Sequence, residues 1–435
     1  MTTRREFLKK MGAMAATGLV MPTILSENNL FARSVAANDK INIALIGCRG
    51  MGWSNLNDFL IHPEVECVAL CDIDKSILEN KASELVKMRS GKPELYGDYR
   101  KLLERKDIDA VIIGTPDHWH CLQMVDACSA GKDVYVEKPL ANSIAECDAM
   151  VAAAKKYNRV VQVGQQQRSG NHWHEMKKYI DSGKLGKIAK VNVWANFGYA
   201  TILNPVPDSP VPAGIDFETW LGPAPKRTFN EKRFHGSWRM FWDYGGGLMT
   251  DWGVHLMDMA LWGMNVNGMP NRILSSGGNF AYPENYAETF DTLSVVYEFD
   301  DFTIQWSNVS IEAGPYGRNY GVEFIGTNGI LVANRESWEV YPVQNKIEAI
   351  KSMPNYQDHR DHVTNFLNCM KTREMNTACT VDNGSLCAKY AHLGNISARV
   401  RSALVYDDVK KTFNHREANK LIKPDYRKPW KFPEL

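Results

Sequence analysis

Between Lys40 and Gly164, short apolar runs alternate with stretches long enough to form helices. The runs are rich in β-branched residues, whose side chains pack well on a pleated sheet. Strands that alternate with helices of this length form a parallel sheet covered on both faces, which is a doubly wound α/β domain of the Rossmann type. We expect its strands at Ile41–Ile46, Val65–Cys71, Ala110–Ile113, Asp133–Val136 and Val160–Val163.

The pattern of the chain changes after Gln165. Longer strand-like runs follow, and short turns are expected at Asp300-Asp301 and Asn328-Gly329. Consecutive strands joined by tight turns form antiparallel pairs, so we expect an α+β domain with an open, mainly antiparallel sheet. Its expected strands are Lys190–Asn196, Thr292–Phe299, Phe302–Ser307 and Gly321–Ile325.

The expected organisation has a leader followed by three folded parts. The leader covers residues 1–37, the doubly wound domain 38–165, an α+β domain for substrate and oligomerisation 166–357, and C-terminal helices with a tail 358–435. The two C-terminal helices, Asp358–Lys371 and Asn383–Ser402, are expected to pack back on the first domain.

The first residues have the pattern of a targeting segment. Arg4-Arg5 is followed by the apolar run Met11–Leu25, which is too short to span a membrane as a mature helix. The pattern resembles a twin-arginine export signal with cleavage near Ala36 or Ala37. It therefore predicts a periplasmic protein with no membrane span in its mature form, and an amphipathic N-terminal helix is the alternative.

Composition argues against several classes of function. The chain has 51 Lys and Arg residues against 50 Asp and Glu residues and no long basic block, which argues against a nucleic-acid or anionic-membrane partner. None of the nine cysteines forms a Cys-x-x-Cys pair, and Cys48, Cys67 and Cys71 lie in or beside expected strands. We therefore expect buried thiols rather than disulfides or zinc ligands.

The turn after the first expected strand resembles a dinucleotide-binding turn with one departure. The pattern Gly-x-Gly-x-x-Gly is met at Gly47 and Gly52, but arginine occupies position 49 and a glycine follows at position 50. Asp72 directly follows the second strand, where a carboxylate accepts both ribose hydroxyls of NAD and repels the 2′-phosphate of NADP. An ordinary strand–helix turn is the alternative. Asp72 favours an NAD site, to which the turn would contribute Gly47, Arg49, Gly50 and Met51.

Two more motifs follow expected strands. Gly114–His120, with the sequence GTPDHWH, follows the third strand, and Glu137-Lys138-Pro139 follows the fourth. Because ligands bind at the carboxyl ends of parallel strands, both motifs are expected at the ligand-binding edge, although a solvated turn is the alternative for Glu-Lys-Pro. Farther along, Asp251 and His255 follow three glycines, and a helix would place them one turn apart. Such a pair is also a common structural hydrogen bond.

These motifs, in this order over nearly all of the expected mature chain, resemble those of the glucose–fructose oxidoreductase, inositol dehydrogenase and rhizopine-catabolism family, Gfo/Idh/MocA. The resemblance implies that Lys138 hydrogen-bonds the reacting hydroxyl and that His255 is the general acid/base. It implies that Asp251 binds a neighbouring hydroxyl or orients His255, and that the Lys138–Pro139 peptide is cis. Further residues implied at the NAD site are Thr115, Pro116, His118, His120, Glu137 and Gln166.

The resemblance also implies substrate contacts. Arg168 and His172 are implied at the floor of the substrate pocket. Trp238 is a candidate to stack on a sugar ring, with a place in the core as the equal alternative.

No metal site is expected. His118 and His120 are two residues apart, as are His172 and His174, so neither pair would share a helix face. His359 and His362, beside Asp358, would share one, but isolated histidines near acids on a helix are mostly surface pairs.

The expected function is NAD-dependent oxidation of a ring hydroxyl of a sugar or glycoside to a ketone, with C3 of glucosides as one candidate position. The alternative is an NAD-dependent retaining glycosidase that oxidises C3 transiently, eliminates the aglycone and returns the hydride. That branch carries Tyr-Pro-Thr-His after its glycines, whereas this chain has Met249–His255, MTDWGVH, which is the dehydrogenase pattern. The presence of Lys138 and His255 argues against a non-catalytic nucleotide-binding partner.

Export has a consequence for the cofactor. Because the periplasm offers no abundant soluble NAD pool, the NAD of an exported enzyme should stay bound through turnover. The family resemblance implies a homodimer or homotetramer that forms through the open sheet, whose second face is expected to be apolar.

Overall fold

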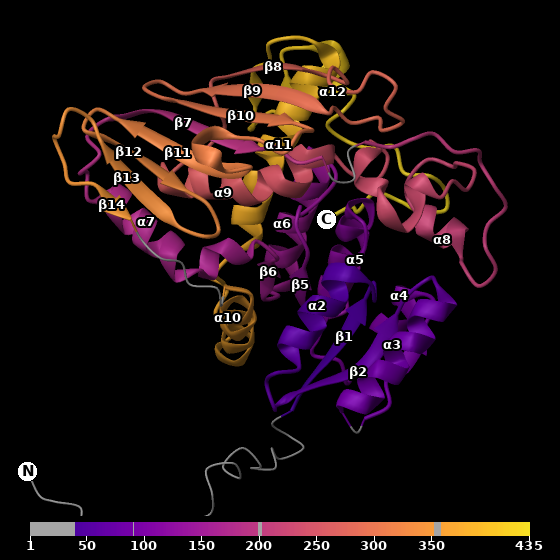
Figure 1. Ribbon diagram of the computed structural model, residues 1–435. Coiled ribbons are helices and arrows are strands. Elements are labelled where there is room, and N and C mark those ends of the chain that lie inside the picture. Colours follow the sequence, from indigo (N-terminus) through magenta and orange to yellow (C-terminus); the bar gives the residue numbers. More distant parts are fainter. Residues whose placement is uncertain (1–39, 90, 199–201, 352–357) are drawn as a thin grey trace, which may run out of the picture. The chain divides into compact units, whose positions relative to one another are not determined.

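The computed structural model describes residues 40–89, 91–198, 202–351 and 358–435 of the chain (Figure 1). The expected leader, residues 1–37, lies outside these ranges. Within them, no helix combines the length and the apolar character needed to cross a membrane. The nine cysteines are buried free thiols, as the sequence predicted.

The first domain is built on a six-stranded parallel sheet in the order β3-β2-β1-β4-β5-β6. This order turns back at β1 and confirms the predicted doubly wound architecture. The strands are β1 Ile41–Ile46, β2 Val65–Cys71, β3 Glu94–Tyr96, β4 Ala110–Ile113, β5 Asp133–Val136 and β6 Val161–Val163. The helices are α2 Gly50–Phe59, α3 Lys75–Met88, α4 Tyr99–Leu103, α5 Asp117–Ser129 and α6 Ile144–Tyr157.

The second domain is built on an eight-stranded sheet in the order β14-β13-β12-β11-β7-β10-β9-β8. Among the described strands, each neighbouring pair is antiparallel except β7 and β10, which run parallel. The predicted open, mainly antiparallel sheet is therefore confirmed. The strands are β7 Ile188–Ala195, β8 Arg272–Gly278, β9 Thr292–Glu298, β10 Thr303–Val309, β11 Tyr320–Gly326, β12 Gly329–Ala333, β13 Trp338–Pro342 and β14 Ile350–Lys351.

Several strands were not expected from the sequence, namely β3, β8, β12, β13 and β14. Strand β3 has only three residues, none of them buried, and β8 contains serines and glycines. Strand β14 has two residues. The short or polar β3, β8 and β14 lack the apolar period that identifies a buried strand, whereas β12 is apolar and directly follows the expected turn at Asn328-Gly329.

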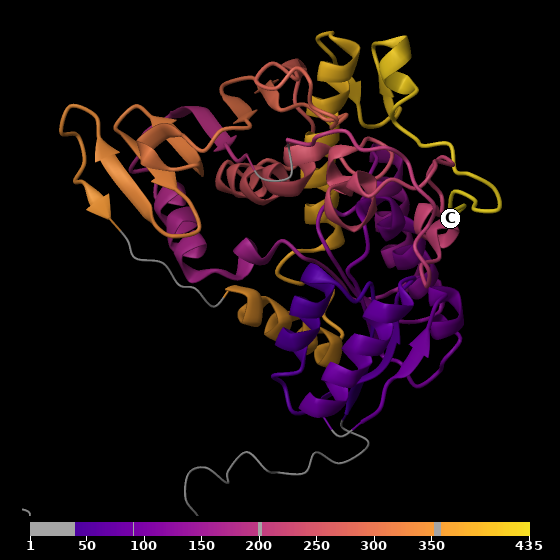
Figure 2. The same cartoon turned by 45° about the vertical axis from the view of Figure 1, so that its right-hand side comes forward.

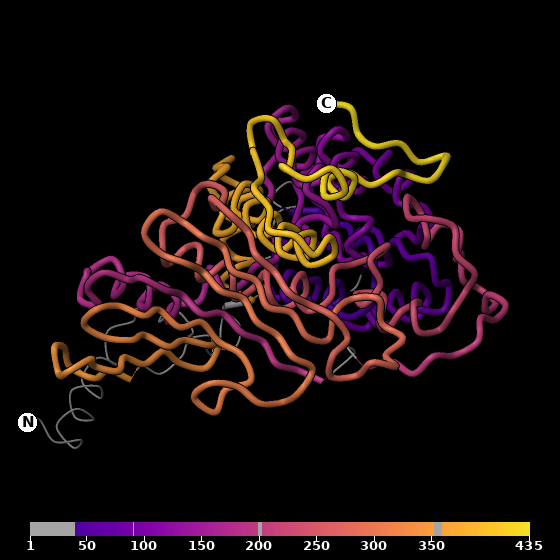
Figure 3. Tube along the Cα trace, turned by 90° about the horizontal axis from the view of Figure 1, so that it is seen from above, coloured from indigo at the N-terminus to yellow at the C-terminus, as the bar shows by residue number. Residues whose placement is uncertain are grey.

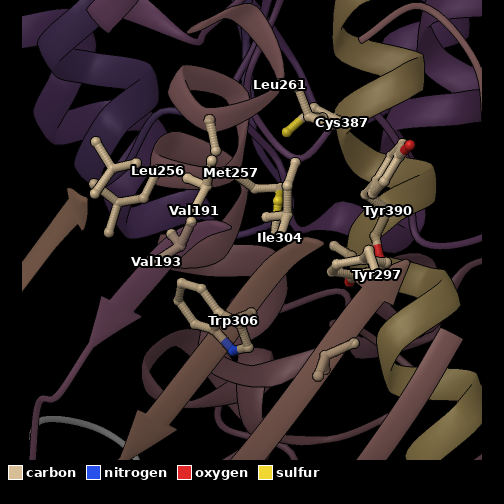
Figure 4. Packing of buried hydrophobic residues seen from close by; sticks show 14 of the residues in the cluster. Val191, Val193, Leu256, Met257, Leu261, Tyr297, Ile304, Trp306, Cys387 and Tyr390 are labelled. Carbon is tan, nitrogen blue, oxygen red and sulfur yellow. The ribbon is translucent and has the colours of Figure 1, made fainter. Parts of the chain in front are cut away.

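The core of the second domain lies between its sheet and two helices, α9 Val254–Gly263 and α11 Val381–Val400. In Figure 4, Val191 and Val193 of β7 lie close to Leu256 and Met257 of α9. On the other side of the cluster, the Tyr297 hydroxyl of β9 donates a 2.6 Å hydrogen bond to the Tyr390 carbonyl of α11. The helix α7, Asn171–Asp181, adds Trp173, Met176 and Ile180 to the same core.

The other face of this sheet is more polar than expected. Along β10, buried residues alternate with the partly exposed Thr303, Gln305 and Ser307. Along β9, the corresponding outward positions hold Thr292, Ser294 and Glu298, with Val296 as the apolar exception. The expectation of an apolar second face is wrong for these strands.

The C-terminal segments connect the two domains. Phe366 of α10, Asp358–Thr372, packs 5.9 Å from Phe59 of α2, between ring centroids. Helix α11 contributes Leu393 to the core of the second domain and Ala388 to that of the first. After a small hairpin, β15 Tyr406–Asp407 and β16 Thr412–Phe413, and the short helix α12 Arg416–Asn419, the yellow tail in Figure 3 runs to the C-terminus.

Residues 202–241 form an irregular segment, here called the strap, that extends from the second domain to the first. Its backbone forms an antiparallel bridge between Ile215 and Asp74, the residue before α3. The strap, which includes the helix labelled α8 in Figure 1, is drawn in pink there and in Figure 2, and it has its own aromatic cluster of Phe217, Trp220, Phe229 and Phe234. Its helical turns are α8 Phe217–Leu221, the π-helical turn η4 Lys232–Gly236 and the 3-10 turn η5 Trp238–Met240.

Candidate active site

The turn after β1 is a close contact of three glycine backbones. A Cβ atom on Gly52 would lie 2.1 Å from the Gly47 carbonyl oxygen, and one on Gly114 would lie 2.5 Å from the Gly52 Cα. Gly47 also has a φ of +89°, which a residue with a side chain rarely adopts. Arg49 stands where the usual pattern has its second glycine. A residue with a side chain fits there because the backbone of Arg49, the N-cap residue of α2, is extended, with a φ of −101°.

Asp72 lies beside this turn at the carboxyl end of β2. Its two carboxylate oxygens accept hydrogen bonds from the Cys48 N–H, at 2.8 Å, and from the Asp74 N–H, at 3.0 Å. Burial raises the pKa of Asp72, and these backbone donors oppose the rise. Each oxygen can accept a further hydrogen bond, so the carboxylate fits a ribose diol.

A cleft runs from the glycine turn to the end of β5. Its lining contains nine residues that the sequence assigned to cofactor or catalysis: Gly47, Arg49, Gly50, Met51, Asp72, Thr115, Pro116, Glu137 and Lys138. The strap completes the lining with Thr219, Trp220, His235, Trp238 and Arg239. The glycine contacts and the carboxylate at Asp72 therefore fit a dinucleotide laid along the edge of the sheet.

Lys138 connects this cleft to the second domain. Its ammonium donates to the Asp251 carboxylate at 2.7 Å and to the Asp251 carbonyl oxygen at 3.0 Å. The Arg239 guanidinium lies 3.1 Å from the same carboxylate oxygen. The Lys138–Pro139 peptide is cis, as the resemblance implied.

Asp251 and His255 are not separated by a regular α-helical turn. Asp251 belongs to the π-helical turn η6, Met249–Gly253, and His255 lies in the first turn of α9. His255 is 7% exposed and lies outside the lining of the cleft. Burial, with the positive charges of Arg335 and Lys138, lowers the pKa of His255 well below its usual value. Its buried Nδ1 has no hydrogen-bond partner among the described residues, so that nitrogen can carry the acceptor lone pair of a neutral imidazole.

The histidines of the GTPDHWH loop hold the loop in place rather than line the cleft. The His118 Nε2 lies 3.0 Å from the Trp220 carbonyl oxygen in the strap. The ring nitrogens of His120 lie 2.8 Å from the Pro139 carbonyl oxygen and 2.9 Å from that of Thr115. His120 therefore ties together the loops that follow β4 and β5.

Glu137 and Gln166 lie in one buried hydrogen-bond network. The Glu137 carboxylate accepts from the Asn55 amide at 2.8 Å and from the Gln166 amide at 3.3 Å. The Gln166 amide also lies 3.2 Å from the Tyr135 hydroxyl. Glu137 thus lines the cleft from a fixed position, whereas Gln166 lies behind it in the turn η3, Gln166–Ser169.

The three candidate substrate contacts are in different places. The Arg168 guanidinium pairs with both oxygens of the buried Asp258 carboxylate, at 2.7 and 2.8 Å, and lines a separate small cavity. His172 is buried, and its Nε2 lies 3.2 Å from the Asn334 carbonyl oxygen. Trp238 does line the cleft, and the Arg239 guanidinium stacks over its ring at 4.2 Å from the centroid.

Among the residues near the site that were not identified from the sequence are four with ionisable side chains. Asp117 lines the cleft, is 2% exposed, and has a pKa that burial raises well above its usual value. His235 and Arg239 reach the cleft from the strap, and the Arg335 guanidinium stacks at 4.6 Å over Trp252 beside the Asp251 turn. Asp117 lies within the GTPDHWH motif and Arg239 follows Trp238. No pattern of neighbouring residues marks His235 or Arg335 as a site residue.

Comparisons with known proteins agree with this architecture. Residues 41–165 match the Gfo/Idh/MocA oxidoreductase family, NAD-binding Rossmann fold. Residues 169–278 and 314–432 match the C-terminal alpha/beta domain of the same oxidoreductase family. Together the two matches cover the first sheet, the second sheet except β9 and β10, and the residues that line the cleft.

Individual relatives are more distant. A glycosyl hydrolase family 109 protein of Shewanella sp. (strain ANA-3) and an alpha-N-acetylgalactosaminidase of Shewanella oneidensis are each 30% identical over 204 residues. That match covers 42% of this chain and only 44% of either relative.

Solved structures share the fold over a longer range. The aldose-aldose oxidoreductase of Caulobacter crescentus has a TM-score of 0.64 at 19% identity, over 84% of this chain and 99% of that one. Levoglucosan dehydrogenase in complex with NADH has the same TM-score and identity, over 84% and 98%. The chain therefore belongs to the Gfo/Idh/MocA oxidoreductase family, and its first domain is that family's NAD-binding Rossmann domain.

Proposed function

We propose that this protein is an NAD-dependent enzyme that oxidises a ring hydroxyl of a sugar or glycoside to a ketone, with C3 of glucosides as the first position to test. The observation that carries the proposal is the Lys138 ammonium, held 2.7 Å from the Asp251 carboxylate in the cleft that also contains Asp72. A fixed ammonium at the end of a dinucleotide cleft can stabilise the negative charge that develops on a hydroxyl as it is oxidised.

The chain's own residues supply positioning and proton transfer. When bound, the nicotinamide supplies the hydride acceptor. Lys138 donates a hydrogen bond to the reacting oxygen and favours its alkoxide form, while Asp251 and Arg239 fix the position of the ammonium. His255 receives the hydroxyl proton, since its lowered pKa keeps the imidazole neutral at pH 7. Trp238, with Arg239 stacked on it, offers an aromatic surface for a pyranose face.

The names of the structural neighbours support a sugar substrate. They include an aldose-aldose oxidoreductase in complex with glycerol and a levoglucosan dehydrogenase in complex with NADH and levoglucosan. Both share the fold of this chain at under 20% identity.

A second candidate function is a retaining glycosidase that oxidises, eliminates and then returns the hydride. The observation that favours it is the 30% identity to glycosyl hydrolase family 109 proteins. The segment Met249–His255 favours the dehydrogenase, because it lacks the Tyr-Pro-Thr-His of the glycosidase branch. Both reactions would begin with oxidation of the ring, and they differ in whether the aglycone leaves.

The test begins with the absorbance spectrum of protein purified without added cofactor. We expect the reduced-nicotinamide band to appear in a stoichiometric burst when a glucoside is added, and to disappear when a keto-sugar acceptor is added. A nitrophenyl glycoside then separates the two candidates. A keto product without nitrophenol supports the dehydrogenase, and steady release of nitrophenol supports the glycosidase. No spectral change with any sugar or glycoside would reject both.

Export and assembly complete the proposal. The Arg4-Arg5 pattern supports twin-arginine export to the periplasm, and the family resemblance supports a homodimer or homotetramer. Fractionation of cells and light scattering at micromolar concentration test these two statements. A cytoplasmic protein would contradict the first, and a monomer would contradict the second.

A further inference from the structure

The strap is attached to the first domain next to the ribose-binding carboxylate. The Lys75 N–H donates to the Gly214 carbonyl at 3.0 Å, and the Asp216 N–H donates to the Ile73 carbonyl at 3.0 Å. Residues 73–75 directly follow Asp72, so the strap crosses the cleft at its adenosine end.

His235 makes the side-chain contact at this crossing. Its Nε2 lies 3.0 Å from the Asp74 carboxylate, whose other oxygen accepts the Ser76 N–H and caps α3. The backbone of His235 has a φ of +62°, a left-handed conformation that is uncommon for a residue with a side chain. Such strain persists where surrounding contacts hold the residue in place, and it is concentrated at binding sites.

The middle of the strap, at and just after α8, is also anchored. The Arg427 side chain of the C-terminal tail donates to the carbonyl oxygens of Gly222 at 3.2 Å and Ala224 at 3.1 Å. The Trp119 indole of α5 donates to the Trp220 carbonyl oxygen at 2.9 Å. A ligand between Asp72 and the strap is therefore enclosed by contacts on both sides of α8.

We propose that the strap is a cofactor-retaining element, in which His235 fastens the segment to Asp74 and closes the cleft over the adenosine half of NAD. NAD would then leave only when the His235–Asp74 contact and the backbone bridge at Ile215 open. This inference deepens the proposed function, because it supplies the means by which the cofactor stays bound through turnover.

The test measures release of cofactor and needs no sugar. Protein loaded with NADH is diluted into excess NAD, and the loss of bound-NADH fluorescence gives the dissociation rate. We expect His235→Ala to accelerate release by on the order of tenfold or more, since it removes a hydrogen bond to a charged acceptor. The matched control is His415→Ala, which removes a histidine that caps α12 outside the cleft, and its rate should equal that of the wild type.

A second variant separates the contact from the backbone strain. Asparagine tolerates the left-handed conformation and keeps an amide donor, so His235→Asn should release NADH more slowly than His235→Ala. If His235→Ala does not fold, His235→Asn and Asp74→Asn are compared with the wild type instead, and both should release NADH faster. Wild-type release rates in folded variants would overturn the proposal, whether or not the protein oxidises sugars.

Discussion

The Lys138 ammonium and the Asp251 carboxylate lie 2.7 Å apart although 113 residues separate them in the chain. The pair joins the end of β5 in the first domain to the turn before α9 in the second. Both side chains are about nine-tenths buried, so the charges are little screened by solvent. The contact therefore fixes the proposed catalytic ammonium relative to both domains.

Replacement of Lys138 should abolish turnover but leave NAD bound in the cleft. We expect Lys138→Ala to lower kcat by roughly 10²–10⁴-fold, because the charge on the reacting oxygen would lose its stabilising donor. Bound NAD, measured in the supernatant of denatured protein, should stay at the wild-type ratio. Turnover within a few fold of the wild type would remove Lys138 from the mechanism.

The pH dependence of oxidation should identify the base. The pKa of His255 is lowered well below 6.5, so the neutral imidazole predominates from neutral to alkaline pH. We therefore expect kcat to be level above pH 7 and to fall only under acidic conditions, as the imidazole gains a proton. His255→Gln should lower kcat and abolish this acid limb. A wild-type kcat that climbs between pH 7 and pH 9 would assign the proton to another group.

Asp72 should set the preference for NAD over NADP. In Asp72→Ser the carboxylate that would repel the 2′-phosphate is absent, so the Kd for NADP should fall relative to that for NAD. Quenching of tryptophan fluorescence measures both constants. The control Glu79→Gln removes an exposed carboxylate of α3 and should leave the ratio unchanged. Equal ratios in Asp72→Ser and the wild type would contradict the assignment.

Glu146 should make stability depend on pH. Burial raises its pKa to about 7, from a usual value near 4.5, although the Tyr426 and Ser143 hydroxyls donate to the carboxyl. Because the folded protein binds this proton more tightly than the unfolded chain does, protonation of Glu146 stabilises the fold. This contribution is fully present below pH 4.5 and is lost as the pH rises to 7. Relative to Glu146→Gln, the unfolding free energy of the wild type should therefore decrease by roughly 3 kcal/mol across this window.

Denaturant unfolding at pH 5 and pH 8 measures that difference. The exposed Glu104→Gln provides a control whose unfolding free energy should track that of the wild type at both values. A difference between Glu146→Gln and the wild type that is the same at pH 5 and pH 8 would contradict the raised pKa.

The contact between glycine backbones should be intolerant of a methyl group. Gly52→Ala would place a Cβ 2.1 Å from the Gly47 carbonyl oxygen, so the turn must shift. We expect a loss of about 1–3 kcal/mol in unfolding free energy together with weaker NAD binding. Gly268→Ala is the matched control, because its Cβ would meet nothing within 4 Å. Equal Tm values and NAD content in the two variants would show that the turn adapts.

Local patterns along the sequence determined the type of each domain and where its ligand-binding edge lies. The alternation of apolar runs with helices predicted the parallel sheet, because period and element length are properties of neighbouring residues. For the same reason, the glycine turn, Asp72 and Lys138 could be placed at the ends of strands, where the structure finds them lining one cleft. Short edge strands such as β3 were missed because three residues without buried side chains carry no such period.

Contacts between segments far apart in the sequence determine which of the candidate side chains reach that cleft. Arg168 is paired with Asp258, and His120 binds two loop carbonyls, since buried polar groups take the partners that packing brings to them. The contact of His235 with Asp74 joins residues 161 positions apart, and no local pattern predicts it. Local periodicity therefore predicted the central strands and the class of each sheet, whereas contacts between the strap, the tail and the two sheets determined the lining of the site.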